Sequence, residues 1–177
     1  MSERLEQYYK YLDGWMAYYG FTPLAIPVDS GLERFYKMTR MEASKFGKND
    51  RYVGVKFMPN VSINDYKESA FKVYGVSRID RQFKGILGFG SMMTTYPLLI
   101  TENISTELAS FAKSYSPLRS RATVEFPSVL DLTSTNLFYS QKTPIWGALY
   151  YAGFRREVYS YFSPSSWKEM SGSINKT

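Results

Sequence analysis

The chain has 177 residues, carries 22 Lys and Arg against 16 Asp and Glu, and contains neither Cys nor His. These absences exclude disulfides, thiolate nucleophiles, Cys-based metal sites and the Ser-His-Asp triad, and they remove the usual general base near neutral pH. A chain of this length favours one domain, which we place at residues 1–162.

The ends and the charge distribution bear on where the protein acts. The N-terminus is charged rather than apolar, and no stretch approaches the roughly 18 apolar residues of a membrane span. We expect an intracellular protein, in a host cytoplasm or in a virion, that is neither secreted nor transmembrane. Residues 31–84 hold twelve Lys and Arg against six Asp and Glu, an excess equal to the whole net charge of +6. An acidic partner would therefore meet this segment.

Residues 2–19 show the clearest helical period. Apolar and aromatic side chains recur at spacings of three and four residues from Leu5 to Tyr19, and Gly20 and Pro23 end the run. The stripe includes Tyr8, Trp15 and Tyr19. It either packs on the protein's own core or docks partly on another subunit, since Tyr and Trp are enriched at interfaces.

A second helix is predicted over residues 32–46, because Ser30 and Glu33 have the spacing of a capping box and Gly47 follows. Its cations form either a solvated helix face or a phosphate-binding face. The candidate nucleic-acid contacts are Arg34, Lys37, Arg40, Lys45, Lys48 and Arg51.

Alternating apolar residues predict strands at about 52–57, 70–77 and 82–89, separated by a loop or short helix, and another strand at 119–126. Strands this close in sequence suggest a small antiparallel sheet over residues 51–90 plus 119–126. The Gly-rich stretch 85–91 lacks the spacing of a dinucleotide-binding or phosphate-binding loop. With N-terminal, middle and C-terminal helices, the fold class is α+β.

Two more helices follow, one from Thr101 or Asn103 to about Tyr115 and one from Pro144 to Phe162. The last is apolar around most of its circumference, so it is either the central core helix or a helix buried partly by a neighbouring subunit. Residues 163–177 are Ser-rich and suggest a flexible tail with one anchor. The candidate interface residues are Tyr8, Trp15, Tyr19, Trp146, Tyr150, Phe154, Tyr161 and Trp167.

Three function classes remain. The scattered carboxylates give no catalytic, metal or cofactor signature, so we expect no enzyme and no cofactor. Aromatic stripes on both terminal helices favour a non-catalytic subunit of a larger homo- or hetero-oligomeric assembly. In composition it resembles phage or viral particle components such as a ring, collar or head–tail connector. The alternative is a nucleic-acid-binding protein that uses residues 31–84 with neighbouring aromatic rings.

Overall fold

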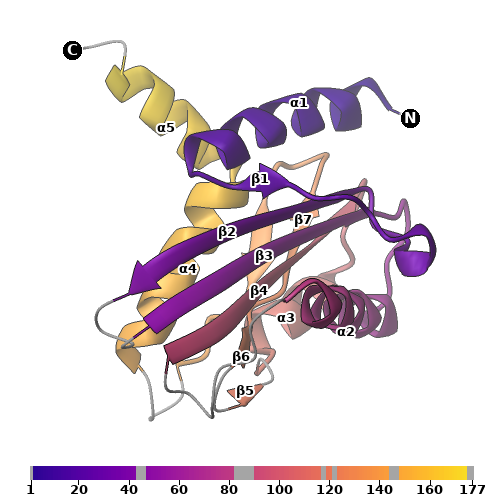
Figure 1. Cartoon of the computed structure of the whole chain (residues 1–177). Coiled ribbons are helices and arrows are strands. Elements are labelled where there is room, and N and C mark those ends of the chain that lie inside the picture. Colours follow the sequence, from indigo (N-terminus) through magenta and orange to yellow (C-terminus); the bar gives the residue numbers. More distant parts are fainter. Residues whose placement is uncertain are drawn as a thin grey trace.

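A computed structural model describes residues 2–42, 47–81, 90–116, 119–120, 123–143 and 148–174. Within these ranges lie five α-helices, one 3-10 helix and eight strands (Figure 1). The helices are α1 (Glu3–Tyr18), η1 (Val28–Ser30), α2 (Ile63–Asp80), α3 (Thr106–Ser114), α4 (Ala148–Phe162) and α5 (Pro164–Ile174). The strands are β1 (Thr22–Pro23), β2 (Arg34–Glu42), β3 (Gly47–Phe57), β4 (Gly90–Thr101), β5 (Arg119–Ser120), β6 (Thr123–Glu125), β7 (Ser128–Asp131) and β8 (Leu137–Tyr139).

The described strands form one mixed sheet in the order β1-β2-β3-β4-β6-β5, with β7 joining β4 to β8. β2 and β3 are antiparallel, whereas β4 runs parallel to β3, β6 and β7. The α+β class is confirmed, but the sheet is larger than predicted and not purely antiparallel. Parallel neighbours need a long crossover connection, and α2 provides it between β3 and β4.

Helices cover both faces of the sheet (Figure 1). α1, α4 and α5 pack on one face in the largest apolar cluster, while α2 and α3 contribute to two smaller clusters on the other. Successive residues of β3 alternate between these layers: Tyr52 faces α2, and Val53 lies in the cluster with α1. The central strands are therefore buried on both sides.

The N-terminal helix is confirmed almost to the residue. Ser2 caps α1 by accepting a hydrogen bond from the Leu5 amide, and the helix buries Leu5, Tyr8, Tyr9, Leu12 and Met16. Gly20, with φ of 85°, then turns the chain in a conformation that a side chain would oppose.

The helix predicted for residues 32–46 is wrong, because Arg34–Glu42 is strand β2. Its charged residues allow a helix locally, but β2 pairs with β3 along its whole length, and this tertiary pairing decides the conformation. Ser30 forms no capping box: its hydroxyl donates to the Pro27 carbonyl at 2.7 Å, and Gly31 adopts a left-handed turn with φ of 64°.

The strand predicted for residues 70–77 is also wrong, because these residues belong to α2. Its buried positions, including Tyr66, Ala70, Val73 and Ser77, follow the helical period rather than alternation. A capping box of Ser62 and Asp65 begins this helix. The strand predicted for residues 82–89 lies outside the described residues.

The central strand β4 was missed from the sequence, in part because Pro97 interrupts its apolar run. Proline is unusual in an inner strand since it has no amide hydrogen to donate. Pro97 lies between the residues of β4 that pair with β6 and those that pair with β7, and its carbonyl accepts from Ser128 Oγ at 3.3 Å. The missing donor therefore falls at the junction of two neighbouring strands.

The C-terminal half keeps its predicted order with shifted boundaries. The single strand predicted for residues 119–126 is wrong, because the chain reverses there: β5 and β6 are two short strands that pair antiparallel with each other. α3 begins after a Ser105 cap rather than at Thr101 or Asn103, because β4 extends through Thr101. Residues 164–174, expected in a flexible tail, form α5, whose Trp167 is buried against α1.

Candidate functional site

Three of the predicted interface residues meet where α1 and α5 lie together. The Trp167 ring stacks on Tyr8 with centroids 5.3 Å apart and on Trp15 at 6.3 Å. Tyr8 and Trp167 are each 5% exposed, whereas Trp15 is half-buried. Residues from opposite ends of the chain thus build one aromatic surface, which neither helix forms alone.

Of the remaining interface candidates, Tyr19 adjoins the same junction, because its ring lies 6.1 Å from that of Trp15 and its hydroxyl donates to Met170 Sδ of α5 at 3.1 Å. The Tyr19 ring also packs edge-on against that of Tyr161, with centroids 4.9 Å apart. Tyr161 and Phe154 lie on α4, and both are buried in the core of the protein. Trp146 and the side chain of Tyr150 lie outside what the structure describes. For Tyr161 and Phe154, the structure supports the core alternative, because their rings contact Tyr96 of β4.

A groove of about 670 Å³ runs beside these stacked rings. Tyr8, Tyr11 and Trp15 of α1 form one wall of the groove, and residues of α5, of β7 and of the turn after it form the rest. The other lining residues are Arg4, Gln7, Leu130, Leu132, Thr133, Thr135, Pro164, Trp167, Lys168 and Ser171. We call this surface the aromatic groove.

The aromatic groove is cationic. Arg4 and Lys168 are exposed at its lining, no carboxylate lines it, and neither cation forms an ion pair with a described residue. Burial raises the pKa of the Tyr8 phenol well above its ordinary value, so Tyr8 stays neutral and donates to the Phe162 carbonyl at 3.0 Å. The groove therefore offers rings, an apolar floor and positive charge.

The candidate nucleic-acid contacts do not gather on one surface. Arg34 pairs with Asp13 of α1 at 3.4 Å, and Lys37 pairs with Asp80 of α2 at 2.8 Å, on the opposite face of the sheet. Arg40 donates to the Tyr19 carbonyl at 3.4 Å. Lys48 is exposed, and Lys45 lies outside the described residues.

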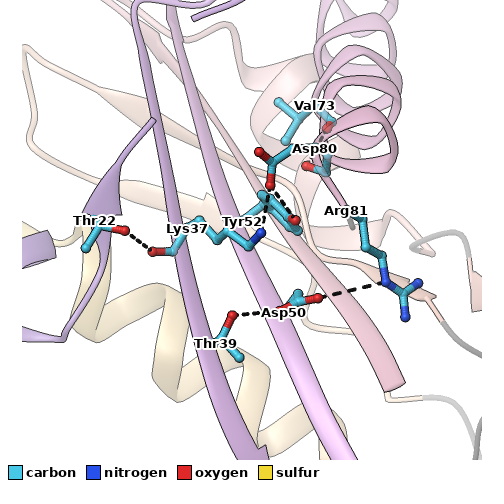
Figure 2. Close-up of polar contacts among 9 residues, drawn as sticks. Thr22, Lys37, Thr39, Asp50, Tyr52, Val73, Asp80 and Arg81 are labelled. Carbon is cyan, nitrogen blue, oxygen red and sulfur yellow. Dashed lines mark hydrogen bonds and ion pairs between the residues drawn. The ribbon is translucent and has the colours of Figure 1, made fainter. Parts of the chain in front are cut away.

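Figure 2 shows how the C-terminus of α2 is fastened to the sheet. The Asp80 carboxylate accepts from Lys37 Nζ and from the Tyr52 hydroxyl, each at 2.8 Å. Asp50 accepts from Thr39 Oγ1 at 2.7 Å and lies 3.9 Å from Arg81 Nε. Because Lys37 pairs with Asp80, its charge joins β2 to the end of α2 within the protein.

Arg51 belongs to a buried polar network on the α4 face. Its Nη1 lies 2.6 Å from Glu157 Oε1 and 3.1 Å from the Tyr161 hydroxyl, and Tyr96 also donates to Glu157. Burial, with the nearby Glu157 carboxylate, raises the pKa of Tyr161 to about 12. Both phenols stay protonated near neutral pH: the Tyr96 hydroxyl donates to Glu157, and the Tyr161 hydroxyl accepts from Arg51.

Sequence reasoning missed the cations of the groove and one buried acid. Arg4 and Lys168 stand outside the basic segment, and only the packing of α5 on α1 brings them to the same groove. Glu125 is 5% exposed, although it lies between the buried residues Val124 and Phe126. In a strand with one solvent-facing side, alternation would place it in solvent, so the sequence did not predict its burial. Glu125 does not line the aromatic groove.

Within the described residues, no cluster of three or more acidic side chains could hold a metal ion. None of the helices in those ranges is both long and apolar enough to cross a membrane. Comparison of the chain with protein-family models, curated proteins and solved structures found no match.

Proposed function

We propose that this chain is a non-catalytic subunit of a larger protein assembly, such as a ring, collar or head–tail connector of a viral particle. The proposal puts partner binding in the aromatic groove. The observation that carries it is the combination of stacked indole and phenol rings, an apolar floor and two cations without carboxylate partners among the described residues.

Interface energetics support this interpretation of the groove. Trp, Tyr and Arg dominate the residues whose truncation weakens protein complexes most, and they cluster in pockets that exclude water. The groove presents all three types within one concave surface. Tyr11 extends that surface outward, because its side chain is 55% exposed on α1.

Nucleic-acid binding through residues 31–84 is the alternative function. It needs several cations that face solvent on one side, because phosphate contacts supply most of the affinity. Arg34, Lys37 and Arg51 instead face carboxylates of this chain from different faces of the sheet. The protein-binding groove is therefore the better-supported proposal.

The test is light scattering of the purified chain, alone and co-expressed with the products of neighbouring genes. We expect a stable complex that Tyr11→Ala combined with Lys168→Glu weakens at least about tenfold, because both side chains line the groove. Phe71→Ala is the matched control, since Phe71 is a ring 68% exposed on α2 and is not a lining residue.

A chain that stays monomeric and joins none of these products would contradict the proposal, as would a complex indifferent to the groove variant. Salt-sensitive binding of single-stranded DNA, lost in Arg40→Glu with Lys48→Glu, would support the alternative instead.

A further inference from the structure

Residues 25–29, Ala-Ile-Pro-Val-Asp, project from the loop between β1 and β2, and we call them the knob. All five are exposed, with Val28 at 97% and Ile26 at 40%. Single exposed apolar residues are common, but four in succession are unusual on a protein surface unless they serve a function.

Hydrogen bonds to backbone carbonyls anchor the knob at both ends. Before it, the Leu24 amide donates to the Phe35 carbonyl at 2.8 Å. After it, the buried Ser30 bonds back to the Pro27 carbonyl through both its amide, at 3.0 Å, and its hydroxyl, at 2.7 Å. Proline restricts the backbone further. A preorganised apolar segment loses little conformational entropy when it binds.

The chemistry of the knob complements that of the aromatic groove. The knob has an apolar body and ends in the Asp29 carboxylate, which forms no ion pair with a described residue. The groove has an apolar floor and presents Arg4 and Lys168. Opposite charges at the two surfaces would fix the orientation of docking.

The knob and the groove lie on separate parts of the chain. The knob includes the start of η1, which contacts α2, whereas residues of α1, α5 and the turn after β7 line the groove. Figure 1 shows α1 and α5 side by side, away from η1. No knob residue lines the groove of its own chain. Contact between them therefore requires two copies, and each copy retains one unused knob or one unused groove after pairing.

We propose that the knob of one copy docks in the aromatic groove of a second copy, so that the chain assembles head to tail. This inference rests on the proposed function of the groove and names its occupant. Such an interface is heterologous: it produces a closed ring if the rotation between copies closes, and an open filament if it does not.

The test uses two complementary variants. The knob variant carries Ile26→Ser and Val28→Ser, and the groove variant carries Tyr11→Ala and Lys168→Glu; all four side chains are exposed, so the fold should survive. We expect the wild type to form oligomers, and the association constant of each variant alone to fall at least about tenfold. Circular dichroism and thermal unfolding verify the fold of each variant.

An equimolar mixture of the two variants should form a dimer and nothing larger. The groove variant supplies an intact knob and the knob variant an intact groove, so only one productive interface exists per pair. Light scattering should then give twice the mass of the 20.5 kDa chain. A charge exchange gives independent support: Asp29→Lys should restore oligomers when combined with Arg4→Glu and Lys168→Glu.

Three results would overturn the proposal. If the mixture remains monomeric, knob and groove do not bind each other. If the knob variant assembles as the wild type does while the groove variant does not, the groove takes a different partner, and the proposed function stands without this occupant. A wild-type chain that remains monomeric but binds a neighbouring gene's product through the groove would likewise exclude the knob as the occupant.

Discussion

At the scale of single residues, Glu125 is a carboxylic acid buried with little polar compensation. It is 5% exposed in β6, and its contact with the Tyr115 hydroxyl is long, at 3.5 Å. Burial disfavours the charged carboxylate and raises its pKa from the usual 4.5 to about 7. The neighbouring Thr95 hydroxyl, in register on β4, is buried without a hydrogen bond among the described residues.

This pKa predicts a pH-dependent stability. Between pH 4.5 and pH 7 the folded protein holds the Glu125 proton more firmly than the unfolded chain, so the free energy of unfolding falls as pH rises through this window. The loss should reach roughly 3 kcal/mol. Glu125→Gln removes it, so the stability difference between wild type and variant, measured by urea unfolding, should change across this range and level off above pH 7.

Glu102→Gln is the matched control for this experiment, because Glu102 is exposed. Its unfolding free energy should follow that of the wild type at every pH. A wild-type curve parallel to that of Glu125→Gln from pH 4.5 to pH 7 would show that the carboxyl titrates normally.

At the scale of elements, the contact between α2 and β3 depends on one glycine. A Cβ at Gly54 would lie within 2.9 Å of Val73 Cγ1 and closer still to its Cγ2. The absence of a side chain in the strand therefore lets the helix approach, and this close approach helps to position α2 for the Asp80 contacts of Figure 2.

Gly54→Ala should cost about 1–3 kcal/mol of unfolding free energy through overpacking, measured by denaturant unfolding. In a Val73→Ala background the same change should cost less, because the clashing methyl groups are gone. Gly75→Ala, where a Cβ meets no atom within 4 Å, should instead stabilise α2 by about 0.5–1 kcal/mol. Equal costs of Gly54→Ala in both backgrounds would contradict this packing.

At the scale of the whole molecule, the two ends of the chain fold against each other. α1 begins the described chain and α5 ends it, and both pack on the same side of the sheet (Figure 1). Trp167 joins them: its indole stacks on Tyr8, and its Nε1 donates to the Ser160 carbonyl at 3.1 Å. The aromatic groove therefore exists only in the complete fold.

Trp167→Ala should lower the free energy of unfolding by about 3 kcal/mol, since it removes a large buried ring between α1 and α5. Lys168→Ala, at the exposed neighbouring position, should change it by no more than about 0.5 kcal/mol. Thermal or urea unfolding measures both. Equal, small effects of the two substitutions would favour the flexible tail that the sequence suggested.

The sequence alone determined what depends on local pattern and composition. The period of residues 2–19, with Gly20 at its end, specifies α1, because the apolar stripe repeats on one helix face. The aromatic pattern also predicted that Tyr8, Trp15 and Trp167 take part in an interface. The absence of Cys and His excludes whole classes of chemistry in any fold.

Only the tertiary structure decided the features that depend on distant partners. Residues 34–42 became a strand because β3 pairs with them. Residues 70–77 became part of a helix that packs Val73 against Gly54 of β3 and ends in Asp80, which accepts from Lys37 and Tyr52. Arg34, Lys37 and Arg51 form no common basic face, because each pairs with a carboxylate of a different helix. Arg4 and Lys168, in contrast, share a groove. Pairing and burial are long-range energies, and local periodicity does not contain them.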